Sequence, residues 1–519
     1  HRPKVQGRRA PDVALAAPQR VEETLRLRPR SLPRAALARP ALHHHPRRPR
    51  AAPRAPRLVT VPRASADTPA ARASDAEQWI EAWKASGSAG AASGAEGALF
   101  ATAKTAVCMG AFLAADKALA AACKSAAITF PSPLVGMFGI LAALLALEQL
   151  AGTGAAESVR DTFKPGLDWL TRWLPLFYVP SLVMLPVAVR PVAPADLARL
   201  VGIIAVGFCG TLWFTGAAAS VIRGFTKTTP SPAPPAKKQP PYNKAEMTAV
   251  GVAAAAGLVC AVAGPASYAT AGAAVYMAAA TVAGLLVGVC VVPAGVQKAV
   301  HPLITTAVVA NAACGVLALL KGAPYMETLA AYLTKGKAAA GGGDLLMAFL
   351  GCVILSFGFR IFDERKVMKK HAVEIIGCTL AASAFSMFST ALAGRLTGLE
   401  PGLTRAAVPR SVTAALAVPI AALLGEGDRL PITLAVVVLS GLVGGAVCVP
   451  LLNAFGFKDP ITRGLATASS SHGIGTAALV NKEPEALPYC ALAYALSGIL
   501  STCLVAIPAV RVALLAVAG

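Results

Sequence analysis

Long apolar runs separated by short polar segments make up most of the chain beyond its N-terminal part. Residues 200–220, 247–265, 272–292 and 432–452 are each apolar over roughly 20 residues, the length at which a helix crosses the roughly 30 Å hydrocarbon core of a bilayer. Windows of this kind number about twelve along the chain. The pattern predicts an all-α polytopic membrane protein in which polar interruptions make some transmembrane helices discontinuous.

The apolar runs fall into two blocks. Residues 99–225 hold about four of the predicted helices, and residues 246–519 hold about eight. Between them, residues 226–245 (TKTTPSPAPPAKKQPPYNKA) contain six prolines and four lysines without apolar periodicity. This composition predicts an extended, solvated linker between two membrane modules. Inside the second block we expect a flexible loop ending in the GGGD of residues 341–344, and a basic turn, DERKVMKKH, at residues 363–371.

Composition supports the membrane assignment and locates most of the charge. Hydrophobic residues make up 55% of the chain, charged residues 14%, and the mean hydropathy is +0.61, outside the range of ordinary soluble domains. The net charge is +22, yet residues 1–73 alone contain sixteen Arg and one Lys against four acidic residues, a net +13. This Arg-, Ala- and Pro-rich segment predicts an organellar transit peptide, followed by a flexible lead-in at residues 74–98. A disordered basic arm that binds nucleic acid or anionic lipid is the alternative.

Several kinds of site are disfavoured by the sequence. The eleven cysteines are scattered without CxxC spacing, so we expect neither a disulfide framework nor a metal site. No phosphate-binding loop or dinucleotide fingerprint stands in a suitable context, which argues against ATP coupling and a bound cofactor. Apart from Asp116 and Glu148, no acidic residue lies well inside a confident apolar span. A cation site built on a buried carboxylate is therefore disfavoured, and proton coupling would use His472 or the substrate acid.

The first candidate for chemistry is TASSSHGIGTAAL, residues 467–479, which lies where a membrane helix would be expected. Hydroxyls and glycines within a span mark a break whose freed backbone groups line a cavity, and glycine adopts backbone angles that other residues resist. Half-helix ends at such a break can bind a small carboxylate near the bilayer midplane. The predicted substrate-binding residues are Ser469, Ser470, Ser471, His472, Gly473, Gly475 and Thr476. The alternative is a close helix–helix contact in which the hydroxyls bond back to their own helix.

A second candidate is VPRSVTAALAVPIAALLG, residues 408–425, in which Pro409 and Pro419 would break or kink a helix. The polar residues at its start are Arg410, Ser411 and Thr413. The Arg410 guanidinium could bind a carboxylate as a two-pronged donor, whereas simple geometry favours snorkelling of the side chain to the membrane surface. Asn311, a lone amide in an apolar run, could bind the hydroxyl of a 2-hydroxy acid or form a structural hydrogen bond between helices.

Broken segments recur at similar spacing in the two blocks. FPSPLVGMFG at residues 130–139 is followed by PLFYVPSLVMLP at residues 175–186, and VPRSVTAAL is followed by DPITRGLATASSSHG. Discontinuous helices in corresponding positions are typical of transporters built from inverted repeats. We therefore expect internal repeats in this chain.

These segments resemble known families. PRSVTAALAVPIA, DPITRGLATASSSHGIGTAALVNKEPEALPYCALAYALSGI and VAIPAVRVALLAVAG closely resemble the C-terminal part of the plastidal glycolate/glycerate translocators of green-lineage chloroplasts. The second block is similar to the LrgB family, and PSPLVGMFG with LPLFYVPSLVMLP is similar to the LrgA family, so that the resemblance covers residues 102–519. The chain departs from the LrgB pattern at residues 468–471, where Ala-Ser-Ser-Ser replaces an Ala/Ser pair before the histidine. It departs again at residues 350–352, where a proline is missing, so a broken helix at residues 349–361 is in question.

The resemblance implies an LrgA-like block at residues 99–225 fused to an LrgB-like transport block at residues 246–519. It also implies a multi-pass carrier of the chloroplast inner envelope that exports glycolate and returns glycerate during photorespiration. The expected partners are these two acids and the lipid bilayer, with a homodimer as a further expectation. Nucleic acid, a cofactor and enzymatic activity are not expected.

Three classes of function are compatible with these features to different degrees. The leading hypothesis is a secondary carrier that exchanges small 2-hydroxy monocarboxylates by alternating access. A holin-like pore or a murein-hydrolase regulator, as associated with bacterial LrgA and LrgB proteins, is the alternative. An intramembrane serine hydrolase using the SSSH run is least favoured, because adjacent helical residues do not face each other and no nearby carboxylate would orient His472.

Overall fold

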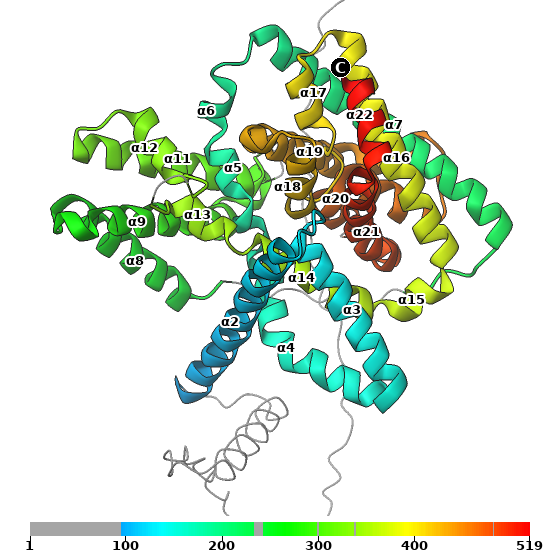
Figure 1. Cartoon of the computed structure of the whole chain (residues 1–519), viewed down its shortest axis with the longest axis horizontal. Helices are drawn as coiled ribbons and strands as arrows, with labels where there is room; N and C mark the ends of the chain where they lie inside the picture. Colours follow the sequence, from blue (N-terminus) through cyan, green and yellow to red (C-terminus); the bar gives the residue numbers. More distant parts are fainter. Residues whose placement is uncertain (1–94, 233–241, 298–299, 337–338, 481) are drawn as a thin grey trace, which may run out of the picture. The chain divides into compact units, whose positions relative to one another are not determined.

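A computed structural model gives the protein's fold, and it describes residues 95–232, 242–297, 300–336, 339–480 and 482–519 (Figure 1). The predicted transit peptide, most of the lead-in and residues 233–241 of the predicted linker lie outside the described residues. The described residues form α-helices joined by short 3-10 and π-helical turns, with no strand among them. The predicted all-α class is therefore confirmed.

The helices of the first predicted block are α2 (Ala95–Ser125), α3 (Ser132–Ala151), α4 (Thr153–Trp173), α5 (Val179–Val183), α6 (Leu185–Val189) and α7 (Pro194–Thr226). Those of the second block, up to and including the basic segment, are α8 (Lys244–Ala263), α9 (Ala266–Leu286), α10 (Ala294–Gln297), α11 (Pro302–Lys321), α12 (Tyr325–Tyr332), α13 (Gly342–Met347), α14 (Leu350–Asp363) and α15 (Arg365–Lys370). The C-terminal helices are α16 (Ala372–Thr397), α17 (Pro401–Ala407), α18 (Ala414–Leu423), α19 (Leu430–Ala454), α20 (Pro460–Val480), α21 (Leu487–Ala506) and α22 (Pro508–Ala518).

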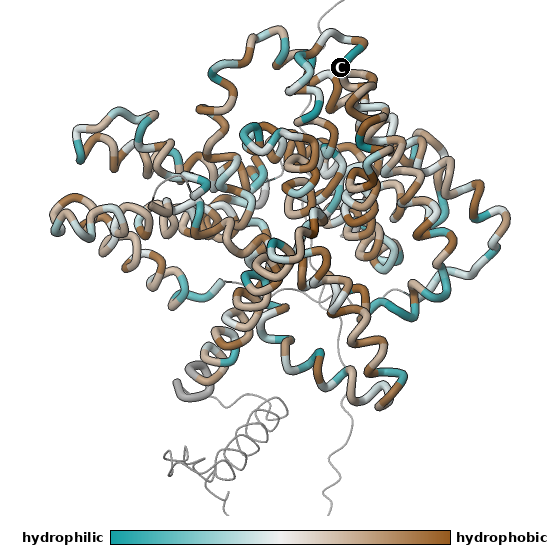
Figure 2. The backbone as a smooth tube through the Cα atoms, viewed as in Figure 1, coloured by the Kyte–Doolittle hydropathy of each residue, from teal (hydrophilic) through white to brown (hydrophobic). Residues whose placement is uncertain are grey.

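Within the described residues, eleven helical segments are long and apolar enough to cross a membrane. Figure 2 shows that the long helices are mainly hydrophobic, whereas hydrophilic residues gather between them, as in the predicted basic turn, which forms the short helix α15. The prediction of about twelve spans is therefore close. The interrupted segments α17–α18 and α20 are not among the eleven, and they confirm that some helices are discontinuous.

Helices of the two predicted blocks interleave in the structure. α7 packs against α16, α19 and α20, α5 packs against α11 and α19, and α3 packs against α14. The described residues belong to one compact unit, Ile80–Gly519. The division of the sequence into two blocks therefore does not correspond to two separately packed bundles.

Two residues at the start of the predicted linker, Thr228 and Ser231, are anchored to helices of the second block. The Thr228 hydroxyl lies 2.9 Å from His371 Nδ1 and also donates to the Glu374 carboxylate, while the Ser231 N–H donates to Tyr489 Oη at 2.6 Å. His371 and Glu374 are 0% and 1% exposed, and buried polar groups need such partners. Burial lowers the pKa of His371, which favours the neutral ring.

The GGGD segment is the start of a helix, where we expected the end of a flexible loop. Gly341 precedes α13, residues 342–344 form its first turn, and the Asp344 carboxylate accepts a hydrogen bond from the Gly341 N–H at 2.9 Å. A Cβ on Gly342 would lie only 2.6 Å from the backbone nitrogen of Ala278 in α9. These glycines therefore permit close helix packing.

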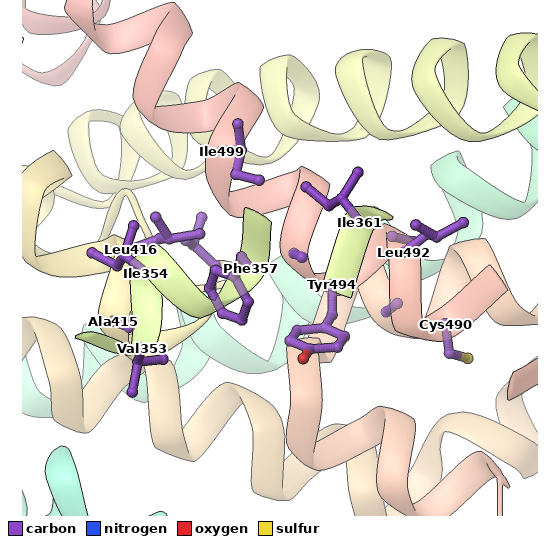
Figure 3. Close-up of a cluster of buried hydrophobic side chains, with 14 of the residues drawn as sticks. Val353, Ile354, Phe357, Ile361, Ala415, Leu416, Cys490, Leu492, Tyr494 and Ile499 are labelled. Carbon is purple, nitrogen blue, oxygen red and sulfur yellow. The ribbon is translucent and has the colours of Figure 1, made fainter. Parts of the chain in front are cut away.

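α14 is continuous from Leu350 to Asp363, so the segment that lacks the LrgB proline is an unbroken helix from Leu350 onward. Its apolar face packs with α18 and α21 in a buried cluster (Figure 3). The rings of Phe357 and Tyr494 meet edge to face, with centroids 6.0 Å apart, and Leu416 of α18 lies in the same cluster. This packing holds the start of α18 in place and thereby positions the polar segment that precedes it.

Candidate substrate site

The predicted break within residues 467–479 is present. α20 leaves helical geometry at Ser471 (φ −135°, ψ 15°) and at His472 (φ 43°, ψ −143°). A positive φ costs a non-glycine residue about 1–3 kcal/mol and persists only where surrounding contacts fix it. The break divides α20 into two half-helices whose backbone groups at residues 471–472 are released from the regular ladder.

Contacts from α19 fix the side chain of His472, which is only 4% exposed. Its Nε2 lies 2.9 Å from the carbonyl oxygen of Val437. Because a carbonyl only accepts hydrogen bonds, this contact assigns the ring proton to Nε2 and leaves Nδ1 as the acceptor of a neutral ring. Gly441 makes room for the imidazole, since a Cβ there would lie 2.7 Å from His472 Nε2.

The glycines around the break act through close packing. A Cβ on Gly444 of α19 would lie 2.1 Å from Ser471 Cβ, and one on Gly475 would lie 1.8 Å from Ser471 Oγ. We expected Gly473 and Gly475 to supply the unusual backbone angles. The positive φ occurs at His472 instead, where the bond to Val437 holds the residue in place.

Hydroxyls beside the break bond mostly to their own helix. Ser470, Ser471 and Thr476 each donate to a backbone carbonyl three or four residues earlier, the shortest distances being 2.8 Å. The close-contact alternative predicts such hydrogen bonds between a hydroxyl and its own helix. They give the carbonyl groups next to the break a donor. Ser469 differs, because it accepts a hydrogen bond from Ser497 Oγ of α21 at 3.2 Å. None of these contacts joins a hydroxyl to the His472 imidazole, so they lend no support to a serine hydrolase.

A second helix is interrupted at the other predicted segment. α17 ends at Ala407 and α18 begins at Ala414, which leaves residues 408–413 outside the helices. Pro409 lies in this gap, whereas Pro419 is accommodated inside α18. Thr413 is the N-cap residue of α18, but its side chain makes no capping hydrogen bond. The amide groups at the start of α18 therefore lack a side-chain acceptor there.

Arg410 lies in this gap and is 0% exposed. Its Nε donates to Thr390 Oγ1 of α16 at 2.9 Å, and its Nη2 donates to the Gly207 carbonyl at 2.7 Å and to Thr211 Oγ1 at 2.8 Å, both on α7. Within the described part of the chain, Nη1 has no hydrogen-bond partner. The guanidinium is enclosed in protein, so the snorkelling alternative does not apply.

The absence of an acidic partner makes Arg410 unusual. None of the ion pairs formed among the described residues includes it. Removing a guanidinium from water is costly unless an opposite charge and hydrogen bonds compensate, and three donor contacts to neutral oxygens compensate only in part. The two N–H groups of Nη1 are thus available to an anion.

A hydroxyl-bearing face of α16 connects the two breaks. Ser383, Ser386 and Thr390 recur at the spacing that places residues on one side of a helix. Ser386 Oγ lies 2.7 Å from Ser411 Oγ, beside Arg410, and Ser383 Oγ donates to the carbonyl of Ser497, whose own hydroxyl reaches α20. Sequence reasoning missed these three residues, although their spacing in SAFSMFST within an apolar span was a usable signal.

Two further buried hydroxyls lie near the Val437 carbonyl that holds His472. Thr433 and Ser440 are four residues before and three residues after Val437 in α19, and therefore on the same side of the helix. Among the described residues, neither Thr433 Oγ1 nor Ser440 Oγ has a hydrogen-bond partner. Both hydroxyls can therefore still form hydrogen bonds in the region around the break.

Asn311 is the predicted site residue that the structure places elsewhere. Its Nδ2 donates to the Ala307 carbonyl of its own helix at 2.8 Å, and its Oδ1 accepts from Tyr325 Oη at 2.6 Å. α11 packs mainly with α9, α12 and α5. Both ends of the amide are satisfied there, which fits the structural alternative.

A groove of about 430 Å³ runs between α7 and α16 next to Arg410. Gly207 and Thr390, which bond to the guanidinium, also line this groove, and Val206 in its wall is 74% exposed. Arg410 and His472 themselves are almost completely enclosed. The two side chains are therefore enclosed by protein, and the groove lies beside the residues that contact Arg410.

A multi-pass helical protein whose interrupted helices present half-helix ends and a buried cation has features of a membrane transporter. Comparisons with known proteins agree with this class. Residues 281–510 match the LrgB-like family. The chain is also 42% identical over 415 residues, 80% of each protein, to plastidal glycolate/glycerate translocator 1, chloroplastic, of Arabidopsis thaliana. The chain therefore belongs to the family of this plastidal translocator and contains an LrgB-like domain.

Bacterial relatives are more distant. The chain is 24% identical over 205 residues to the holin-like protein CidB of Staphylococcus epidermidis, a match that covers 40% of this chain and 84% of that protein. It is 27% identical over 136 residues to the antiholin-like protein LrgB of Bacillus subtilis, covering 26% of this chain and 58% of that protein. No solved structure matches the chain. The LrgA-like character of the first block stays a prediction.

Proposed function

We propose that the protein is a secondary transporter that exchanges glycolate and glycerate across the chloroplast inner envelope in photorespiration. The name of the Arabidopsis relative supports the substrates and the plastid, and the Arg-rich, acid-poor N-terminal segment independently fits an organellar address. Transport proceeds by alternating access around α20 and the α17–α18 pair.

The observation that carries the proposal is the environment of Arg410. It is fully buried, it has no acidic partner among the described residues, and its Nη1 is free of protein hydrogen bonds. A small monocarboxylate brings the missing negative charge and the acceptor oxygens that this nitrogen needs. A site that already contained its own carboxylate would favour a cation.

The 2-hydroxyl of the substrate is recognised by the other break. With its proton on Nε2, the His472 ring offers Nδ1 as an acceptor for an alcohol O–H. An analogue without the hydroxyl leaves such a buried partner unsatisfied, at a cost of about 1–3 kcal/mol for each lost hydrogen bond. The enclosed position of both side chains excludes larger acids.

The alternative function is a holin-like pore or a regulator of murein hydrolases, and the names of the CidB and LrgB relatives favour it. A pore needs a continuous open path, whereas Arg410 and His472 are 0% and 4% exposed in a closed arrangement. A carrier that opens to one side at a time accounts for this enclosure.

Reconstitution tests the proposal. Purified protein is placed in liposomes loaded with unlabelled glycerate, and uptake of labelled glycolate is followed with lactate and pyruvate as competitors and with an imposed pH gradient. We expect saturable uptake that internal glycerate accelerates, with lactate competing better than pyruvate because pyruvate lacks the 2-hydroxyl. Uptake that rises linearly with concentration, ignores internal glycerate and accompanies measurable conductance would establish the pore.

A further inference from the structure

α7 has an unexpected position among the helices. It belongs to the first block of the sequence, but its main neighbours are α16, α19 and α20 of the second block. In Figure 1 it lies alongside α16, far along the sequence from its own position. Its residues therefore contact the helices that form the candidate substrate site.

The middle of α7 contacts both breaks. The Gly207 carbonyl and Thr211 Oγ1 accept hydrogen bonds from Arg410 Nη2 at 2.7 and 2.8 Å. The neighbouring Phe208 lies beside the break in α20, because a Cβ on Gly444 would be 3.1 Å from Phe208 Cε2 and 2.1 Å from Ser471 Cβ. A single turn of α7, residues 207–211, thus contacts both the Arg410 segment and the break in α20.

The C-terminal end of α7 fixes its register against α20. Arg223 Nε and Nη2 donate to the two carboxylate oxygens of Asp459 at 3.1 and 3.0 Å. Asp459 also accepts from the Thr462 backbone N–H at 2.9 Å, and so caps the start of α20. A two-pronged ion pair at a helix start restrains sliding of α7 along α20.

These contacts determine the orientation of the guanidinium. Nε is bonded to α16 and Nη2 is bonded twice to α7, so the planar group is held at two of its three nitrogens. Only Nη1 then remains to meet an anion. Without the α7 acceptors, Nη2 would lose both of its partners. The guanidinium plane could then rotate about its one remaining hydrogen bond, from Nε to Thr390.

We propose that α7 is part of the substrate site, with Gly207 and Thr211 as positioning residues that aim Arg410 Nη1 at the substrate carboxylate. The two sequence blocks then form one transport unit, in which the first block completes the site of the second. This inference rests on the proposed function, because it takes Arg410 as the carboxylate-binding residue.

The test compares three variants in the glycolate exchange assay. Thr211→Val removes the acceptor, Thr211→Ser keeps a hydroxyl, and Thr215→Val is the matched control. Thr215 is equally buried one turn along α7 and donates only to the Thr211 carbonyl of its own helix. We expect Thr211→Val to raise the KM for glycolate at least about fivefold, as expected for a weakened charged hydrogen bond. The Ser variant and the Thr215 control should stay within about twofold of wild type, and kcat should change little in all three.

A glycine pair tests the same helix in another way. A Cβ on Gly207 would lie 2.7 Å from Arg410 Nε and would displace the guanidinium, whereas a Cβ on Gly210 would lie 3.9 Å from Phe385 Cε1, an ordinary contact. Gly207→Ala should therefore raise the KM and Gly210→Ala should not. Fluorescence size-exclusion chromatography and thermal unfolding identify any variant that fails to fold.

The outcomes separate this inference from the proposed function. If Arg410→Met abolishes exchange while Thr211→Val and Gly207→Ala keep the wild-type KM, α7 is only a packing element and the inference is overturned. If Arg410→Met itself exchanges like wild type, the proposed site is wrong, and the positioning role of α7 is overturned with it. A raised KM that Thr211→Ser restores, with unchanged thermal unfolding, supports a positioning role.

Discussion

Buried polar side chains differ in their hydrogen bonding between two groups of helices. The first group surrounds α9 and α11, and the second surrounds α16, α20 and α21. Figure 1 places the first group among α8 and α12, apart from the interrupted helices. There, Thr281, Thr306 and Asn311 each bond to a backbone carbonyl four residues earlier in their own helix, and Thr281 and Asn311 also bond to tyrosines of α12. Around the breaks, by contrast, Arg410 Nη1, Thr433 Oγ1 and Ser440 Oγ have no hydrogen-bond partner among the described residues.

The difference follows from the backbone. A continuous helix satisfies its own N–H and C=O groups, so only its polar side chains need partners, in the same helix or in a neighbouring one. Where residues 408–413 and 471–472 leave helical geometry, backbone and side-chain groups must find partners on neighbouring helices. Polar atoms that still lack a partner, such as Arg410 Nη1, then mark where a ligand can bind. The comparison teaches that unpaired buried polar atoms gather where helices are interrupted, which is why the proposed site lies in the second group.

Replacement of Arg410 should give the largest effect. Arg410→Met removes the proposed carboxylate donor and should slow glycolate exchange about 100-fold, the loss expected for one strong charged hydrogen bond. Thermal unfolding should be unchanged or improved, because a buried charge without an acidic partner is removed. The control is Arg463→Met, which leaves the largely buried Glu483 without its partner and should lower the free energy of unfolding by about 3 kcal/mol. Equal loss of stability in both variants would mean that Arg410 is structural.

His472→Gln should give the next largest effect. The amide can keep a bond to Val437 but no longer presents the ring acceptor, so exchange of glycolate should fall about tenfold, equivalent to one hydrogen bond. Discrimination against acetate, which lacks the hydroxyl, should fall by a similar factor in competition assays. A variant that still prefers glycolate over acetate as strongly as wild type would remove His472 from hydroxyl recognition.

A pair of glycines in α19 tests whether the break itself matters. Gly441→Ala places a Cβ 2.7 Å from the His472 ring, whereas Gly445→Ala meets Ala478 Cβ at an ordinary 3.8 Å. We expect the first variant to reduce exchange about fivefold by displacing the imidazole from Val437, a loss of about 1 kcal/mol. The second should be close to wild type. Similar rates in both would show that the position of the ring is not critical.

Asn311→Leu should give the smallest effect on transport. Its KM for glycolate should stay within about twofold of wild type, while the free energy of unfolding falls by about 1 kcal/mol because Tyr325 loses its acceptor. Transport kinetics and thermal unfolding of the same preparation check both parts. A KM that rises while stability is unchanged would return Asn311 to the substrate site and weaken the comparison between the two groups.

Local features of the site were predictable from sequence, whereas contacts between distant helices were not. The run of serines before His472 and the Pro409 segment predicted the two breaks, because such residues weaken a helix wherever they stand. The same run did not indicate that His472, and not a glycine, would take the positive φ, since that depends on the bond to Val437. The helical character of the long apolar runs followed directly from their length.

The burial of Arg410 could not be deduced from its own segment. On sequence alone, an arginine at the start of an apolar run is expected to reach the membrane surface. The partners that enclose it, Gly207, Thr211 and Thr390, come from two helices distant in the chain. Anchoring of the predicted linker through Thr228 likewise depends on residues far along the sequence. Pattern reasoning is limited here because it contains no information on which helices become neighbours.

The central claim is that a small carboxylate binds between the two breaks at Arg410. Its most direct test is an experimental density map of the protein in lipid nanodiscs with saturating glycerate. We predict density for the acid with a carboxylate oxygen within hydrogen-bond distance of Arg410 Nη1 and the hydroxylated end toward His472. Glycerate bound elsewhere, with Arg410 still enclosed by Gly207, Thr211 and Thr390 alone, would contradict the account.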